Sequence, residues 1–148
     1  MRGTTKAEGC SCSAARQASR HLSRYYDEAL APAGLSLNQY AILSNAFDYG
    51  PQTIQSLADR LVMDRSTLGH LLRPLEARGW LAIAPHATNK RQRVIVSTKA
   101  GKETLFLARG LWVEAERGFE QAFGVEDAAT FRRLMSRIVA MDLQVASK

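Results

Sequence analysis

The sequence lacks the segments that would carry it into or across a membrane. Its opening residues contain no apolar core long enough for a signal peptide, and no later stretch reaches the roughly 18 to 20 apolar residues of a membrane span. We therefore expect a cytoplasmic protein with no membrane partner. No internal repeat, low-complexity tract or linker divides the 148 residues, which predicts a single domain.

The residue patterns that carry catalysis are also missing. There are no paired carboxylates at catalytic spacing, no nucleophile elbow, no phosphate-binding loop and no metal-binding helix. We therefore expect neither an enzyme nor a cofactor. Hydrophobic residues make up 46% of the chain, as in an ordinary globular protein, but the net charge is +6. No acidic residue falls between His86 and Lys102, and this local excess of positive charge favours an anionic partner.

The segment from Met63 to Gly79 has the pattern of an amphipathic helix. Apolar residues at i, i+3, i+4 and i+7 predict one buried face, made of Leu68, Leu71, Leu72 and Leu75. Asp64 is the expected N-cap. The opposite face and its N-terminal flank carry Arg65, Ser66, Thr67, His70 and Arg73. Such side chains contact base edges and phosphates, which predicts a DNA-reading helix; an ordinary surface helix is the alternative.

A second short helix is predicted just before this one. The residues from about Thr53 to Val62 repeat the same apolar spacing, and a tight turn at Met63 and Asp64 separates the two helices. Two short helices joined in this way are typical of a helix-turn-helix. Inside the DNA-reading helix predicted between Met63 and Gly79, Pro74 predicts a kink, because proline has no amide hydrogen to donate to the preceding turn.

A basic hairpin is predicted after Gly79. Residues 80–84 and 93–97 have the composition of strands, and the polar loop between them carries His86, Asn89, Lys90 and Arg91. A cationic hairpin tip can lie along a phosphate backbone or place an arginine in a narrow minor groove. A solvated polar loop is the alternative, and the absence of acidic residues favours the nucleic-acid interpretation.

Four longer helices are predicted on either side of this core, at residues 13–31, 35–48, 99–123 and 126–145. The last two carry heptad-like apolar stripes: Leu105, Ala108, Trp112, Ala115, Phe119 and Ala122, then Phe131, Leu134, Ile138, Met141 and Val145. Such stripes require a helix to pack against. The partner helix could belong to the same subunit or to a second copy of the chain.

The run LADRLVMDRSTLGHLLRPLEARGWL, followed by the hairpin and by STKAG, resembles the winged-helix core of the MarR family of bacterial transcriptional regulators. The resemblance implies a mainly α (α+β) fold, with a winged helix-turn-helix at residues 53–98 and dimerisation helices at 13–50 and 99–148. Two positions depart from the family pattern. Asn89 replaces the usual wing aspartate, and Ser97 and Thr98 replace the usual Leu-Thr after the second strand.

The resemblance also implies a function. We expect a homodimeric repressor that binds double-stranded DNA at a pseudo-palindromic operator, with reading helices roughly 34 Å apart. A signal that changes this separation, either thiol oxidation or a small phenolic or aromatic inducer, would release the DNA. The expected DNA contacts are Arg65, Ser66, Thr67, His70, Arg73, Lys90 and Arg91. A winged-helix module that binds protein instead of specific DNA is the alternative.

Cys10 and Cys12 allow three interpretations: inert thiols, part of a soft metal site, or a peroxide-sensitive switch. A metal site needs more ligands than these, and the histidines are not spaced to complete one, so we expect no metal. Cys12 matches the reactive cysteine of the family's organic hydroperoxide regulators, and Tyr26 matches a tyrosine that engages it. Along one continuous helix these two residues would be roughly 21 Å apart, so they could meet only across a dimer.

Overall fold

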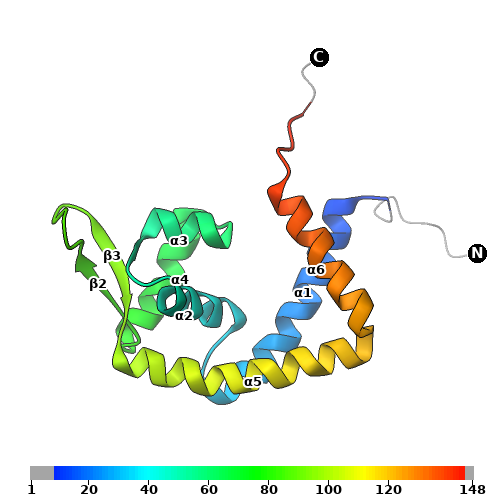
Figure 1. Cartoon of the computed structure of the whole chain (residues 1–148), viewed down its shortest axis with the longest axis horizontal. Helices are drawn as coiled ribbons and strands as arrows, with labels where there is room; N and C mark the ends of the chain where they lie inside the picture. Colours follow the sequence, from blue (N-terminus) through cyan, green and yellow to red (C-terminus); the bar gives the residue numbers. More distant parts are fainter. Residues whose placement is uncertain (1–8, 146–148) are drawn as a thin grey trace, which may run out of the picture. The chain divides into compact units, whose positions relative to one another are not determined.

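The computed structural model describes residues 9–145 and is mainly helical, with a small antiparallel sheet (Figure 1). The elements in order are α1 (Ser11–Leu30), a 3₁₀ turn η1 (Ala31–Ala33), α2 (Leu37–Asp48), β1 (Gln52–Thr53), α3 (Ile54–Leu61), α4 (Arg65–Ala77), β2 (Leu81–Pro85), β3 (Arg93–Ser97), α5 (Lys99–Phe123) and α6 (Val125–Ala140). The predicted fold class is confirmed. None of the helices within residues 9–145 is long and apolar enough to span a membrane.

The chain forms two compact units, one ending at Trp112 and the other beginning at Val113. The first unit contains the winged helix-turn-helix, and its helices begin at residues that satisfy their free backbone amides. The side chain of Ser36 accepts from the amide of Gln39, whose own side chain accepts from the amide of Ser36, so α2 begins with a complete capping box. The side chain of Thr53 caps α3 in the same manner.

The turn between α3 and α4 is made by a strained residue. Val62 has φ +53° and ψ +45°, the left-handed conformation that β-branched residues rarely adopt. Its amide donates to the carbonyl of Asp59, and the next amide, of Met63, donates to the carbonyl of Ala58. These bonds complete the C-terminus of α3 and turn the chain into α4 within a few residues, as the helix-turn-helix prediction requires.

The three-stranded sheet has the order β1-β3-β2, and both pairings are antiparallel. In the β2–β3 hairpin, Ile83 pairs with Ile95 and Pro85 with Arg93, which leaves residues 86–92 as the tip. The short strand β1 pairs with the other edge of β3, through Gln52 and Ile95. The hairpin matches the predicted wing, and β1 ties the wing to the start of α3.

The core of the first unit is built from residues of α1 to α5 and of the strands β2 and β3. Its largest fully buried side chains are Leu30, Ile42, Leu43, Leu57, Leu68, Leu75, Ile95 and Leu105. On α4, Leu68, Leu72 and Leu75 are buried as predicted, and Leu71 is partly buried against them. This anchoring fixes which face of α4 points outward.

The STKAG segment joins β3 to α5 by a close backbone contact. The hydroxyl of Thr98 accepts from the amide of Gly101 and donates to the carbonyl of Gly79. A Cβ at Gly101 would lie 2.0 Å from the carbonyl oxygen of Trp80, so only glycine fits here. The motif therefore holds the base of the wing against the first turn of α5.

The second unit contains the end of α5 and all of α6. The ring of Phe123 stacks on Phe119 and meets the edge of Phe131, and the guanidinium of Arg132 contacts the carboxylates of Glu116 and Glu120. The prediction that the last helix reaches Val145 is wrong, because α6 ends at Ala140. Beyond α6, Met141 is extended and Val145 is 96% exposed. A helix here would bury too little apolar surface to offset the conformational entropy that it would lose.

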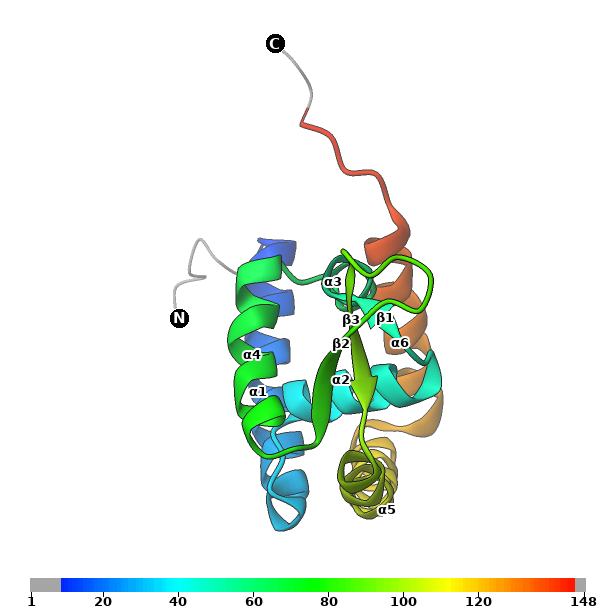
Figure 2. The same cartoon turned by 90° about the vertical axis from the view of Figure 1, so that its left-hand side faces the viewer.

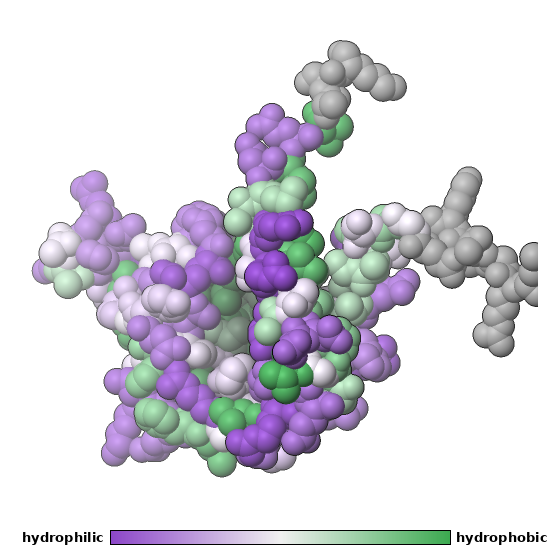
Figure 3. Space-filling model, turned by 45° about the vertical axis from the view of Figure 1, so that its right-hand side comes forward, coloured by the Kyte–Doolittle hydropathy of each residue, from purple (hydrophilic) through white to green (hydrophobic). Residues whose placement is uncertain are grey.

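Apolar residues also remain on the surface of α6. Leu134 is 36% exposed, Ile138 46% and Val139 65%. Along this helix, hydrophobic surface runs beside hydrophilic surface (Figure 3). Within one chain these residues therefore lack the burial that their apolar character favours.

Candidate nucleic-acid interface

Helix α4 presents its predicted contact face to solvent. Its exposed residues include Arg65, Ser66, Thr67, His70 and Arg73, while Gly69 is partly buried and adds no side chain between them. The helix runs through Pro74 to Ala77, so the proline does not end it. A row of short polar and cationic side chains on a rigidly anchored helix has the dimensions to enter a major groove.

Asp64 and Thr67 form the N-terminal cap of α4. The carboxylate of Asp64 accepts from the backbone amide of Thr67 at 2.8 Å and from its hydroxyl at 2.6 Å. The bond from that hydroxyl, together with the amide, holds the pKa of the Asp64 carboxyl below its usual value. Because the Thr67 hydroxyl proton is donated to Asp64, this hydroxyl can serve DNA only as an acceptor.

The tip of the wing carries the other predicted contacts. Lys90 and Arg91 are exposed, while His86 at the start of the tip is partly buried. Asn89, which stands where the family has aspartate, accepts from the backbone amide of Arg91 through its Oδ1 at 3.2 Å. The amide side chain therefore orients the backbone beside Arg91 without a negative charge.

The two parts of the interface lie on one side of the winged helix. Figures 1 and 2 both show the N-terminal end of α4 and the tip of the β2–β3 hairpin directed toward the same side. Helix α4 and the wing tip, whose predicted contact residues are exposed, thus extend toward the same side. The geometry allows a helix in one groove with the wing along the neighbouring phosphates.

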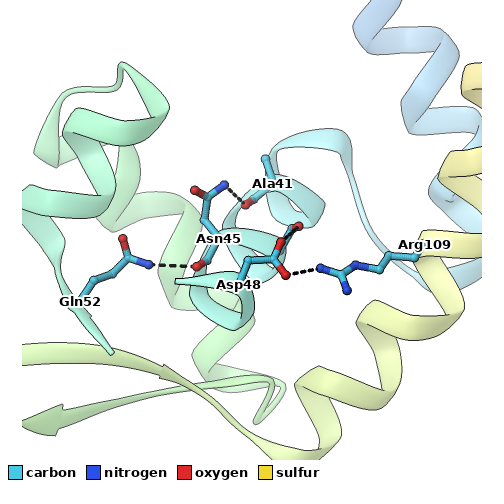
Figure 4. A network of polar contacts seen from close by, with 6 residues as sticks. Ala41, Asn45, Asp48, Gln52 and Arg109 are labelled. Atoms are coloured by element: carbon cyan, nitrogen blue, oxygen red, sulfur yellow. Dashed lines mark hydrogen bonds and ion pairs between the residues drawn. The ribbon is translucent and has the colours of Figure 1, made fainter. Parts of the chain in front are cut away.

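A pocket of about 460 Å³ lies between α2 and α5, away from this surface. Its lining is formed by Leu37, Tyr40, Ala41, Ser44, Asn45, Asp48, Arg109 and Trp112. At its rim the guanidinium of Arg109 donates to the carboxylate of Asp48 at 2.5 Å, and the hydroxyl of Ser44 donates to the same carboxylate at 3.0 Å (Figure 4). The ring of Tyr40 stacks on that of Trp112 with centroids 6.1 Å apart.

These contacts shift two pKa values in opposite directions. The hydrogen bond from Arg109 lowers the pKa of the Asp48 carboxyl, and burial raises the pKa of the Tyr40 phenol. Deeper along α2, the side chain of Gln52 donates to the carbonyl of Asn45 at 3.1 Å, linking this helix to β1 (Figure 4). The pocket therefore offers stacked aromatic rings, a cation and a connection to the wing sheet.

Residues 35–92 match the sequence profile of the MarR family. The match extends from the residues just before α2 to the tip of the wing, so the winged helix-turn-helix is similar to that of the MarR family. The HTH-type transcriptional regulator Hpr of Shouchella clausii (strain KSM-K16) is 32% identical over 90 residues, which cover 61% of this chain and 42% of that protein. The chain thus spans about two fifths of the curated relative that it matches.

Solved structures share the MarR-family fold. The M. tuberculosis transcriptional regulator MosR, in a complex with DNA, superposes with a TM-score of 0.78 at 28% identity, covering 88% of this chain and 93% of MosR. Bordetella bronchiseptica BpsR, whose DNA binding is regulated by 6-hydroxynicotinic acid, superposes with a TM-score of 0.83 at 14% identity, covering 95% and 100%. The second likeness concerns the fold alone.

The two cysteines lie at the start of α1. Both are exposed, and Cys10 is the N-cap, with φ −94° and ψ 110°, while Cys12 lies in the first turn. Tyr26 is buried near the other end of the same continuous helix. The structure therefore does not bring Cys12 and Tyr26 together within one chain. Among residues 9–145 no three His, Cys, Asp or Glu side chains are grouped to hold a metal ion.

Sequence reasoning missed two features of the site. The Asp48–Arg109 pair joins residues 61 positions apart, and neither residue stands in a recognisable motif, so no local signal predicts it. The role of His86 was missed for a different reason. Its residue type indicates only another basic side chain in the wing, whereas its ring accepts hydrogen bonds from backbone amides of the tip.

Proposed function

We propose that this protein is a homodimeric transcriptional repressor that binds double-stranded DNA through α4 and the wing. The observation that carries the proposal is that the N-terminal end of α4 and the wing tip extend toward the same side (Figures 1 and 2). The predicted contacts on these two elements are all exposed: Arg65, Ser66, Thr67, His70, Arg73, Lys90 and Arg91. The DNA complex of MosR, a protein of 28% identity and the same fold, supports it. His70 and Arg73 would read bases or contact phosphates in the major groove, while Lys90 and Arg91 would contact phosphates.

The direct test is binding to the DNA upstream of the protein's own gene, followed by fluorescence anisotropy at several salt concentrations. We expect Arg91→Ala to weaken binding about tenfold and to lower the salt slope by about one, because one phosphate contact is lost. His70→Ala should instead reduce discrimination between operator and scrambled DNA.

Lys99→Ala is the matched control, since Lys99 is an exposed cation that follows the end of β3 remote from the tip. It should change neither the affinity nor the slope by more than about twofold. The DNA proposal is wrong if the wild-type protein binds neither the upstream DNA nor the scrambled DNA, or if its binding does not weaken as salt is added. A winged-helix module that binds protein would then be the better interpretation.

The exposed apolar residues of α6 support the proposed dimer, because a second copy would bury them. In this proposal residues 13–50 and 99–148 supply the interface. Ile138→Asp places a charge among them and should give a monomer by sedimentation velocity, whereas Ser136→Asp, at an exposed polar position of the same helix, should leave the dimer intact. A wild-type protein that is monomeric at tens of micromolar would contradict the dimer.

For release from DNA we propose oxidation of Cys12 by an organic hydroperoxide, with Cys10 as its partner. The two thiols would become a disulfide while the peroxide ROOH becomes ROH and water. On a helix, i and i+2 side chains diverge, but the extended backbone of Cys10 places the first thiol outside α1, so only the first turn would need to rearrange. Cys12→Ser should keep DNA binding and lose the response; peroxide-driven release that persists in this variant would exclude the switch.

A small phenolic or aromatic ligand in the α2–α5 pocket is the second candidate signal. The Tyr40–Trp112 stack and the Arg109 guanidinium favour a flat ring that carries a polar group. Isothermal titration with hydroxybenzoate should detect binding to the wild type and not to Ala41→Leu, which adds volume to the pocket lining. Equal binding by both proteins would place the ligand elsewhere, and indifference to hydroxybenzoate in the DNA assay would leave oxidation as the signal.

A further inference from the structure

The side chain of His86 organises the tip of the wing. Its Nδ1 accepts from the backbone amide of Thr88 at 3.2 Å and from that of Asn89 at 3.3 Å, and the hydroxyl of Thr88 lies 3.1 Å from the same nitrogen. A backbone N–H can only donate. Nδ1 must therefore be unprotonated in this arrangement, with the hydrogen of the neutral ring on Nε2.

This pattern reproduces the turn that asparagine or aspartate usually makes. In such turns a side-chain oxygen accepts from the amides two and three residues later, and Nδ1 of His86 contacts the amides at those two positions. The imidazole thus acts as a hydrogen-bond acceptor for the backbone. Since the ring is partly buried, it is less available than the exposed cations of the tip for contact with DNA.

The remaining bonds of the tip continue from His86. The amide of His86 donates to the carbonyl of Gln92 at 2.8 Å and closes the loop, and the amide of Gln92 donates to the carbonyl of Asn89 at 2.9 Å. The side chain of Asn89 accepts from the amide of Arg91. Lys90 and Arg91 are therefore held between Asn89, whose amide is bonded to the His86 ring, and Gln92, which is bonded to the His86 backbone.

We propose that His86 is the positioning residue of the wing, which presents Lys90 and Arg91 to the DNA backbone through the acceptor Nδ1 and not through its own positive charge. The inference deepens the proposed function and rests on it. Removing the acceptor would leave two backbone amides of the tip to water, and the loop would sample many conformations in which its cations do not meet the phosphates.

The test compares His86→Ala, which removes the acceptor, with His86→Asn, whose Oδ1 can occupy the place of Nδ1. We expect His86→Ala to weaken operator binding about tenfold and to lower the salt slope by about one. His86→Asn should restore both quantities to near the wild-type values. Thr88→Val is the matched control, because it removes the hydroxyl beside Nδ1 and keeps the amide, so its affinity should stay within about threefold of the wild type.

Amide hydrogen exchange followed by NMR gives a readout that needs no DNA. The amides of Thr88 and Asn89 should be protected in the wild type and in His86→Asn, and should exchange faster in His86→Ala. If His86→Asn behaves like His86→Ala in both measurements, or if His86→Ala matches the wild type, the proposal is wrong. If no protein binds operator DNA while the exchange pattern is as expected, the DNA function fails and the role of His86 in ordering the tip stands.

Discussion

The winged helix and the C-terminal helix α6 differ in how far their apolar side chains are buried and in how their helices are capped. Inside the winged helix Leu57 and Leu68 are fully buried, and α3 and α4 begin at side chains that cap them, Thr53 and Asp64. On α6, by contrast, Ile138 is 46% exposed, and the helix begins at Gly124 without a side-chain cap. The winged helix thus buries its large apolar side chains within one chain, whereas α6 leaves apolar side chains exposed to solvent.

Helix α1 resembles α6 in this respect. Its N-cap, Cys10, makes no side-chain capping bond, and within α1 only Tyr26 and Leu30 are buried. Rearranging the first turn of α1 should therefore cost little free energy, since few buried contacts would be lost. In the proposed regulator, the helices assigned to sensing and dimerisation bury few of their own residues, whereas the part assigned to DNA binding holds most of the buried core.

The largest expected effect lies at the junction of the wing with α5. Gly101→Ala would place a Cβ 2.0 Å from the backbone oxygen of Trp80, and neither backbone can move without disturbing the sheet or the helix. We expect a loss of at least about 3 kcal/mol in the free energy of unfolding, measured by urea denaturation. Gly110→Ala is the control on the same helix: a Cβ there meets nothing within 4 Å, so this change should stabilise by about 0.5 to 1 kcal/mol. Equal effects at the two glycines would refute the contact.

The next prediction separates the two regions directly. Leu68→Ala removes a fully buried side chain and should cost about 3 kcal/mol at every protein concentration. Ile138→Ala removes a half-exposed side chain. Its cost should depend on concentration, because a second copy would bury this side chain in the proposed dimer. Thermal unfolding at 1 and at 100 micromolar would measure both. A concentration-independent cost for Ile138→Ala would mean that α6 finds its partner within its own chain.

The same contrast explains how much could be predicted from the sequence. Within the winged helix, the caps Ser36 and Asp64 and the spacing of the leucines are local signals that agree with one another, so the helices and the wing were predicted nearly to the residue. The fold of this region is specified by short-range chemistry that a sequence displays directly.

Two other parts could not be predicted in this way. The apolar spacing of α6 continues to Val145, but spacing alone does not tell whether a surface exists to bury Met141 and Val145, and the helix ends at Ala140. The Asp48–Arg109 pair and the acceptor role of His86 depend on the three-dimensional placement of single atoms. Residue types indicated a basic wing, and only the geometry distinguishes the cations from the residue that positions them.

A smaller effect is expected at Val62, a β-branched residue with a positive φ in the turn between α3 and α4. Val62 is 71% exposed and holds a left-handed conformation, so its side chain contributes strain and little burial. Val62→Gly should stabilise by about 0.5 to 1 kcal/mol, after the greater flexibility of unfolded glycine is subtracted from the relieved strain. Val62→Ala keeps a Cβ and should gain less. If Val62→Gly lowers the free energy of unfolding in urea denaturation, packing of the Val62 side chain outweighs any backbone strain.

The smallest expected effect concerns the ion pair between α2 and α5. The hydrogen bond from Arg109 lowers the pKa of Asp48 from its ordinary value of 3.8, so the folded state favours the ionised carboxylate. The pair therefore stabilises the fold above pH 3.8, and this contribution is lost as the pH falls through the lower pKa of the folded state. Because both side chains are about a third or more exposed, the coupling should stay below about 1 kcal/mol at neutral pH. A double-mutant cycle of Asp48→Asn and Arg109→Gln, repeated between pH 7 and pH 3, measures it. A coupling that grows on acidification would reverse the assigned sign, since only the ionised carboxylate attracts the guanidinium.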